Sequence, residues 1–306
     1  MKVYVVHAFS DSREGGNPAG VVFQPGKEEL SETQMQDLAA KLKFSETAFV
    51  AECPMKQDGD TFRGTDREIE RAFRIRYFTP VCEVPLCGHA TIAVFSFLRQ
   101  RDVIKDGSYY LLTKEEELVV EVSDGLVWME MAHPVLEKVP DEQTIEEICA
   151  AYELDRSELS EEIEPRIVKA GIRDLHIFVK DHDILMKARQ HKEEVAAISR
   201  RLSVAGVHMS WLTGEKGMIA HCSNFAPYYG IDEECATGTS NAGLTFYLYQ
   251  KGLITPEEEN CFLQGEHMRR PSKIYSKIRF LHENISVWIG GTAVICEERQ
   301  MNRGIE

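Results

Sequence analysis

The sequence contains no run of apolar residues that approaches the roughly 20 needed to span a bilayer. Its N-terminal MKVYVVHAFS also lacks the longer apolar core and the small-residue cleavage site of a signal peptide. No Pro- or Ser-rich linker divides the chain. We therefore expect a cytoplasmic protein with no membrane partner, whose eight cysteines are thiols rather than disulfides.

Positive charge is also scarce. The chain has 35 Lys and Arg against 50 Asp and Glu, a formal net charge of -15. An acidic surface repels phosphate backbones and anionic lipids, which excludes nucleic acid as an expected partner. The 306 residues are 43% hydrophobic and 28% charged, as in globular chains large enough for two domains.

Several elements are predicted from local patterns. Ser31 and Gln34 form a capping box ahead of apolar positions with helical spacing, so residues 31–42 should be a helix. Periodicity further predicts strands at 2–8 and 20–23, and amphipathic surface helices at 143–151 and 183–202.

Two segments are apolar on nearly all sides and should be buried helices. They are CGHATIAVFSFLRQRD, from Cys87, and TGTSNAGLTFYLYQKG, which ends at Gly252. Each begins at a cluster of Cys, Gly and Thr and lies among many short strands. The repetition predicts two similar halves, each with strands around one apolar helix.

The beginnings of these helices are candidate binding sites. A helix N-terminus attracts anions such as a carboxylate and lowers the pKa of a cysteine placed there. Cys87 and Cys235, on two helix ends opposed across a cleft, would hold a small carboxylic acid between proton-transfer groups. Such chemistry requires no metal and no organic cofactor. The alternative is that both cysteines simply begin buried helices and pack there.

Two further side chains are candidates. Glu46 in FSETAFV begins an apolar strand, where burial of a carboxylate is costly unless the group is paired or functional. The alternative is a glutamate at the strand end that simply faces water. GGNPAG lacks the lysine of a phosphate loop and the spacing of a dinucleotide fingerprint, so we interpret it as a tight turn presenting Asn17 to a ligand.

A zinc site is the competing interpretation of the cysteines. Cys82, Cys87 and His89 are spaced C-x4-C-x-H, and His221 with Cys222 would complete a set. This spacing is not a common zinc pattern, and Gly-His resembles the first turn of a helix. We therefore predict no metal site.

The order of motifs GNPAGVV, FSETAFV, YFTPVCEVPLCGHATIA, GIDEECATGTS and QGEHMRRPS resembles the phenazine-biosynthesis PhzF-like family. The resemblance implies an α+β, diaminopimelate epimerase-like fold of two pseudo-symmetric halves, each a barrel-like β-sheet around a central helix. The halves would be residues 1–118, completed by the last strand at about 285–298, and residues 119–284. It also implies a cofactor-free isomerase, a homodimer, with the active site between the halves.

The resemblance assigns roles residue by residue. The glutamate of the SETAFV-type motif, expected to carry the proton, is Glu46, and the Gly-His pair is Gly88 and His89. The second loop of the family reads Glu-Asp-Pro-x-Thr-Gly-Ser, and here Glu234, Cys235 and Thr239 replace its Asp, Pro and Ser. The expected catalytic residues are Glu46, Cys87, His89, Glu234 and Cys235, and the expected substrate-binding residues are Asn17, Gly88, Thr237, Gly238 and Thr239.

The departures leave the reaction open. Cys-Gly-His and Cys-x-Thr-Gly-Thr-Ser are similar to motifs of proline racemases and diaminopimelate epimerase, in which one cysteine removes the α-proton and another returns it. One hypothesis is a PhzF-like isomerase in which Glu46 shifts a double bond of a small acid. The others are a racemase or epimerase of amino or hydroxy acids that uses Cys87 and Cys235, and a non-catalytic binding protein on the same fold.

Overall fold

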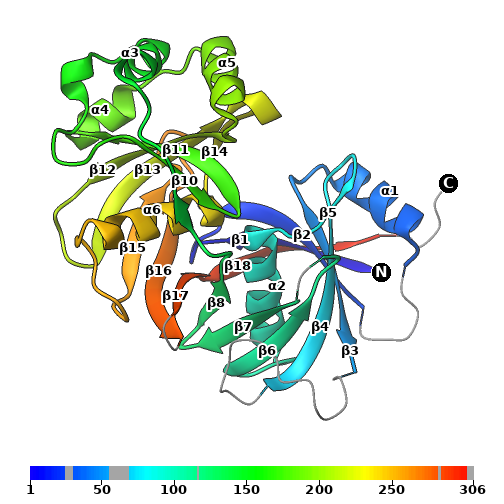
Figure 1. Cartoon of the computed structure of the whole chain (residues 1–306). Helices are drawn as coiled ribbons and strands as arrows, with labels where there is room; N and C mark the ends of the chain where they lie inside the picture. The colour runs from blue at the N-terminus through cyan, green and yellow to red at the C-terminus, as the bar shows by residue number, and fades with distance from the viewer. Residues whose placement is uncertain (25–29, 55–68, 116, 282–283, 302–306) are drawn as a thin grey trace. The chain divides into compact units, whose positions relative to one another are not determined.

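The computed structural model describes residues 1–24, 30–54, 69–115, 117–281 and 284–301. The chain forms two compact units, Met1–Glu130 with Gly290–Glu306, and Met131–Ile289. In each unit a sheet of short strands packs against one buried helix (Figure 1). Among the described residues, no helix has the length and apolar character that crossing a membrane requires.

The first unit is built around α2 (Gly88–Gln100), whose residues from His89 to Leu98 are all buried. Its sheet has the strand order β18-β1-β2-β3-β4-β6-β7-β8, with β5 paired to β4. Helix α2 contacts both end strands, β18 and β8, as well as β1, β2 and β3, so the sheet curves around it. The strands are β1 Lys2–Ala8, β2 Asn17–Gln24, β3 Thr47–Cys53, β4 Ile69–Phe78, β5 Glu83–Val84, β6 Gly107–Leu112, β7 Glu117–Ser123, β8 Leu126–Glu130 and β18 Ala293–Gln300.

The outer face of this sheet is covered by α1 (Glu32–Leu42). Met35, Leu38 and Leu42 of the helix pack against strand residues such as Val22 and Phe49. The capping box is confirmed, because Ser31 Oγ accepts from Gln34 N at 3.3 Å while Gln34 Oε1 accepts from Ser31 N at 2.9 Å.

The second unit is built around α6 (Gly238–Gln250), which is buried from Ser240 to Leu248. Its sheet has the order β9-β10-β11-β12-β13-β15-β16, with β14 paired to β13, and α6 contacts β10, β11 and β16. The strands are β9 Val135–Leu136, β10 Arg166–Ala170, β11 Ile172–Val179, β12 Gly206–Leu212, β13 Met218–Ala226, β14 Ile231–Glu234, β15 Asn260–Gln264, β16 Ser272–Leu281 and β17 Asn284–Gly291.

Three helices cover the other face of the second sheet, and Figure 1 shows them grouped there. They are α3 (Glu142–Ala151), α4 (His182–Lys187) and α5 (Lys192–Leu202). The prediction of one helix over 183–202 is wrong. Arg189 N and His191 N instead donate to the carbonyls of Tyr152 and Ala151 at the end of α3, which separates α4 from α5.

The two units repeat the same pairing pattern. Along β1-β2-β3-β4-β6-β7 the pairs are alternately antiparallel and parallel, and along β10-β11-β12-β13-β15-β16 they alternate in the same way. In both units the central helix follows a short strand, β5 or β14, and leads into the strand that pairs in parallel. The predicted α+β class, two similar halves each with a sheet around a central helix, is confirmed.

Candidate active site

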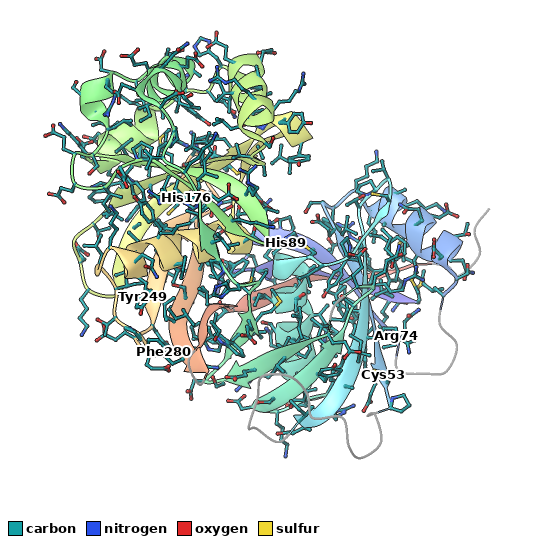
Figure 2. All side chains as sticks on the ribbon, in the orientation of Figure 1. Cys53, Arg74, His89, His176, Tyr249 and Phe280 are labelled. Carbon is teal, nitrogen blue, oxygen red and sulfur yellow. The ribbon has the colours of Figure 1, made fainter. Side chains whose placement is uncertain are left out.

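The first unit brings Glu46, Cys87 and His89 together. Glu46 directly precedes β3, and its carbonyl accepts from Gly20 N at 3.1 Å, which ties it to β2. Cys87 is the N-cap of α2, and His89 is the second residue of that helix, at the position labelled in Figure 2. Glu46 and Cys87 are 41 positions apart in the chain, and they lie close together because β3 and α2 pack within one unit.

The imidazole of His89 lies between the other two side chains. Its Nδ1 is 3.4 Å from Cys87 Sγ, and its Nε2 is 3.3 Å from Glu46 Oε2. One ligand atom from each of the three residues lies within 4.8 Å of the others, so the cluster could also hold a metal ion. A carboxylate, an imidazole and a thiol at these distances can exchange protons with one another and with a bound substrate.

Burial sets this cluster apart from a surface ion pair. The His89 side chain is 6% exposed and that of Glu46 is 21% exposed. Glu46 Oε2 and His89 Nε2 are buried, yet neither makes a hydrogen bond of good geometry despite their 3.3 Å separation. Buried polar atoms left without such a bond are uncommon and require an explanation, and a bound substrate is one.

The start of α2 supplies the electrostatic part of this arrangement. The first N–H groups of a helix have no intrahelical partner and favour a negative charge. Gly88 and His89 carry such groups, immediately after the Cys87 N-cap. Asn17 is buried as the first residue of β2, the strand that pairs in parallel with β3.

The predicted residues of the second unit surround the start of α6. Thr237 is the N-cap, and its Oγ1 donates to Glu234 Oε2 at 2.6 Å. Gly238 and Thr239 are the first two residues of the helix. The Glu234 carboxylate is therefore hydrogen-bonded to the N-cap residue of α6.

Gln264, at the end of β15, is a site residue that sequence reasoning missed. Its Oε1 accepts from Thr237 N at 3.2 Å and from Asn241 Nδ2 at 2.8 Å. Its Nε2 donates to the carbonyl of Glu234 at 2.7 Å and to Thr237 Oγ1 at 3.0 Å. It begins the motif QGEHMRRPS, and as an uncharged residue beside several ionisable ones it gave no signal of its role.

Cys235 is not placed like Cys87. Helices α2 and α6 both have 13 residues, and their N-caps are Cys87 and Thr237, so Cys235 lies two residues ahead of the matching position. Burial raises the pKa of the Cys235 thiol to about 11, although the charge of Arg270 acts in the opposite direction. This direction is opposite to the lowering that a cysteine at a helix N-terminus is expected to show.

A second histidine–carboxylate pair lies beside the start of α6. His267 Nδ1 is 3.3 Å from Glu233 Oε1 and 3.2 Å from Ser223 Oγ. The hydrogen bond with Glu233 raises the pKa of His267. The sequence gave no signal that Glu233 and His267, 34 positions apart, would meet.

The five residues considered for zinc do not come together as one set, although Cys87 and His89 lie together beside Glu46. Among the described residues, the groups of three that could hold a metal include neither Cys82 nor Cys222. Cys82 is exposed, with its Sγ 3.6 Å from Thr79 Oγ1, and Cys222 is buried with its Sγ 3.5 Å from Ser210 Oγ.

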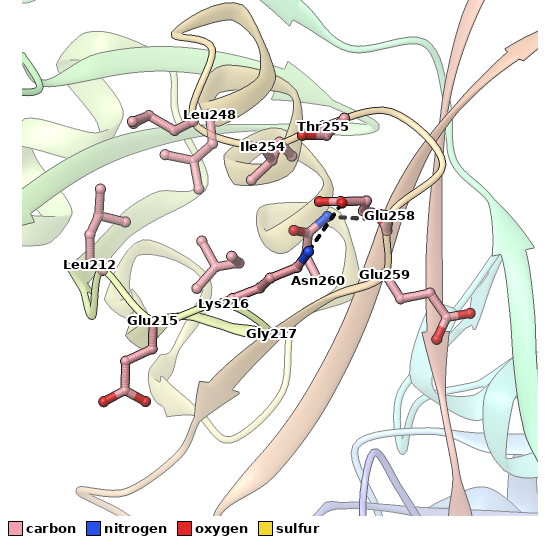
Figure 3. A pocket seen from close by; sticks show the side chains of 13 residues that line it. Leu212, Glu215, Lys216, Gly217, Leu248, Ile254, Thr255, Glu258, Glu259 and Asn260 are labelled. Atoms are coloured by element: carbon pink, nitrogen blue, oxygen red, sulfur yellow. Dashed lines mark hydrogen bonds and ion pairs between the residues drawn. The ribbon is translucent and has the colours of Figure 1, made fainter.

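A hollow of about 740 Å³ lies elsewhere in the second unit, between the turn after β12 and the loop that follows α6 (Figure 3). Leu212, Leu248 and Ile254 line it together with Lys216, whose Nζ is 3.4 Å from Glu258 Oε1. None of the predicted site residues lines this hollow.

The sequence of the chain is similar to those of known proteins over almost its whole length. Residues 6–299 match the family model described as phenazine biosynthesis-like protein. An uncharacterized isomerase of Clostridium acetobutylicum is 28% identical, with 96% of this chain and 95% of that protein covered.

Solved structures show the same fold. The PhzF-family phenazine biosynthesis protein of Bacillus anthracis superposes with a TM-score of 0.83 at 24% identity, covering 99% of both chains. A probable proline racemase of Agrobacterium radiobacter superposes with a TM-score of 0.57 at 11% identity, covering 99% of this chain and 93% of that one. At these identities both similarities concern the fold alone.

Proposed function

The chain belongs to the phenazine biosynthesis-like protein family, and from this we propose that it is an isomerase that moves a proton on a small carboxylic acid. The observation that carries the proposal is the buried cluster of Glu46, His89 and Cys87 at the start of α2. Its carboxylate lacks a well-formed hydrogen bond at Oε2, which leaves that oxygen able to accept a proton from a substrate.

In the proposed reaction Glu46 takes a proton from one carbon of a conjugated acid and returns it to another. The double bond moves, and no atom is gained or lost. His89 Nε2, 3.3 Å from Glu46 Oε2, is close enough to exchange a proton with the carboxylate, and the N–H groups at the start of α2 stabilise the negative charge that develops. A positioned general base of this kind contributes about 10²–10⁴-fold to a rate.

We further propose that the start of α6 contributes to binding the substrate. Gly238 and Thr239 present N–H groups there, and the hydrogen bonds of Thr237 with Glu234 and Gln264 hold that helix start in place. The proposal includes no organic cofactor, a cytoplasmic location and a homodimer, and these three points depend on composition and on family resemblance.

A racemase that uses two cysteines is the alternative, favoured by the Cys-x-Thr-Gly motif and by the fold shared with a proline racemase. It requires a thiolate at Cys235. With a pKa of about 11, about one Cys235 in 10⁴ is ionised at pH 7. Glu46 instead offers a carboxylate oxygen 3.3 Å from His89 Nε2, without a thiolate being required.

Proton NMR in deuterated water with a panel of small unsaturated, amino and hydroxy acids tests the proposal. Deuterium incorporation together with migration of a double bond is the expected result. Deuterium at an α-carbon with loss of optical purity would replace the proposal with the two-cysteine reaction. No exchange with any acid in the panel would favour the third hypothesis, a binding protein.

A further inference from the structure

A second group of potential ligands lies in the second unit, apart from the residues assigned to catalysis. His182 begins α4, His221 lies within β13, and Glu266 follows β15. One ligand atom from each lies within 4.8 Å of the others. Their side chains are 35%, 18% and 23% exposed, so the group is reachable from solvent without being on the open surface.

Both imidazoles approach the same carboxylate oxygen. His221 Nδ1 is 2.7 Å and His182 Nε2 is 3.3 Å from Glu266 Oε2. Tetrahedral ligands about 2.1 Å from a zinc ion are about 3.4 Å from one another, so a small widening of the shorter contact admits a cation. The pairs His191–Glu153 and His267–Glu233, also of this unit, each have a single imidazole.

The scaffold holds these ligands in place. The indole of Trp211 packs against both imidazoles, with ring centroids 5.4 Å from His182 and 5.2 Å from His221. Trp211 and His221 are directly paired across β12 and β13. At the start of α4, Asp181 Oδ1 accepts from Ile184 N at 2.8 Å and fixes the helix that begins with His182.

Glu266 is held by a turn that tolerates little change. Gly265 has φ 88°, and a Cβ there would lie 2.5 Å from the carbonyl oxygen of Arg270. Arg270 N donates to the carbonyl of Gly265 at 3.0 Å, and Arg269 N donates to that of Glu266 at 2.9 Å. These backbone hydrogen bonds fix the turn and thereby the position of the Glu266 carboxylate beside the two histidines.

We propose that His182, His221 and Glu266 form a binding site for a divalent transition-metal ion of the zinc class. Two imidazoles and one carboxylate are a donor set typical of such ions, and water completes the coordination. The ion joins α4, β13 and the turn after β15, and by binding the folded state it stabilises the second unit. This site is independent of the proposed proton transfer at Glu46.

Titration of the EDTA-treated, full-length protein with Zn²⁺ by calorimetry, and with Co²⁺ by absorption spectroscopy, tests the site. We expect a single ion per chain, visible cobalt bands without a thiolate-to-cobalt charge-transfer band, and a higher melting temperature with Zn²⁺. Glu266→Gln and, separately, His182→Ala should each weaken Zn²⁺ binding by about tenfold or more.

Two controls separate this site from the other histidines. His191→Ala removes an exposed imidazole that is paired with Glu153 and should leave Zn²⁺ binding unchanged. Glu46→Gln should also bind Zn²⁺ normally, because the cluster of Glu46, Cys87 and His89 is a separate group. Equal Zn²⁺ affinity in His182→Ala and wild type, no Zn²⁺ binding by wild type, or a cobalt–thiolate band that disappears in Cys87→Ala would each overturn the proposal.

Discussion

Cys87 and Cys235 have the same side chain in different surroundings. Cys87 caps α2 and lies 3.4 Å from His89 Nδ1, whereas Cys235 precedes the α6 cap by two residues. A Cβ on Gly265 would lie 3.0 Å from the Cα of Cys235, so the turn after β15 packs closely there. Local surroundings, rather than the shared motif, therefore set the reactivity of each thiol.

Thiol alkylation should follow these surroundings. Iodoacetamide at pH 7.5 should modify the exposed Cys82 first, because burial raises the pKa of Cys222 to about 12 and those of Cys235 and Cys261 to about 11. Peptide mass spectrometry over time measures the order. Cys82→Ser should remove the fast phase. Modification of Cys235 as fast as that of Cys82, with protection by a substrate, would instead support the two-cysteine reaction.

The sequence identified Glu46, Cys87 and His89 individually but not their contacts. Their distances depend on the packing of β3 against α2, which local patterns do not encode. His182, His221 and Glu266 are 39 and 45 positions apart in the chain and form no recognisable spacing. The pKa of Cys235 was expected to fall, because the sequence does not show which residue caps the helix or how deeply the thiol is buried.

At the scale of elements, the layer between α6 and its sheet is unusually polar. A row of His176, His208 and Asn224 crosses β11, β12 and β13. Figure 2 labels His176 within this part of the second unit. In the first unit, the row of Val21, Ala48 and Tyr77 that crosses β2, β3 and β4 contains no imidazole.

Hydrogen bonds connect this layer to the helix. Asn224 Nδ2 donates to Ser240 Oγ at 3.0 Å, and Ser240 Oγ donates to Asp174 Oδ2 at 2.5 Å. Burial raises the pKa of Asp174 to about 6 and lowers that of His208 to about 3. Relative to the unfolded chain, the folded unit therefore favours the protonated form of Asp174 and the neutral form of His208.

Asp174→Asn should change how stability depends on pH. The folded-state pKa of Asp174 exceeds its ordinary value, so its stabilising contribution is complete below pH 3.8 and is lost as pH rises through about 6. The free energy of unfolding of wild type, relative to the variant, should fall by about 2 kcal/mol from pH 4 to pH 7.

Guanidinium unfolding at several pH values measures this difference. Asp183→Asn, which changes an exposed aspartate on α4, serves as the matched control and should show a constant offset from wild type. A constant offset for Asp174→Asn as well would contradict the elevated pKa of Asp174.

Elements were predicted from the sequence where local signals decide them. The capping box and apolar spacing placed a helix at residues 31–42, and α1 spans Glu32–Leu42. The helix predicted at 143–151 corresponds to α3, Glu142–Ala151. The break between α4 and α5 could not be predicted, because it depends on backbone bonds to the end of α3.

At the scale of the whole molecule, the first unit is completed by a strand from a distant part of the chain. The last strand, β18, pairs with the first strand, β1, whereas the strands of the second unit are consecutive in the sequence. β1 lies between β18 and β2, and its Val3, Val6 and Ala8 are fully buried. The first unit therefore depends on residues near both ends of the sequence.

A chain truncated after Gly291 should lose the stability of the first unit. Removal of β18 leaves one edge of β1 unpaired and uncovers part of α2. Thermal unfolding by circular dichroism should show a fall in melting temperature of roughly 10 °C or more, or no soluble protein. A chain truncated after Met301, which retains β18, is the control. Equal melting temperatures of the two chains would contradict the role given to β18.

The rate of substrate deuteration in wild type, Glu46→Gln and Cys235→Ala tests the central claim most directly. It is measured by proton NMR in deuterated water with an acid that wild type converts. Glu46→Gln should lower the rate by about 10²-fold or more, because it removes the general base and keeps the shape of the side chain. Cys235→Ala should change the rate only slightly. Full activity in Glu46→Gln, with abolished exchange in Cys235→Ala, would contradict the assignment of Glu46 as the proton carrier.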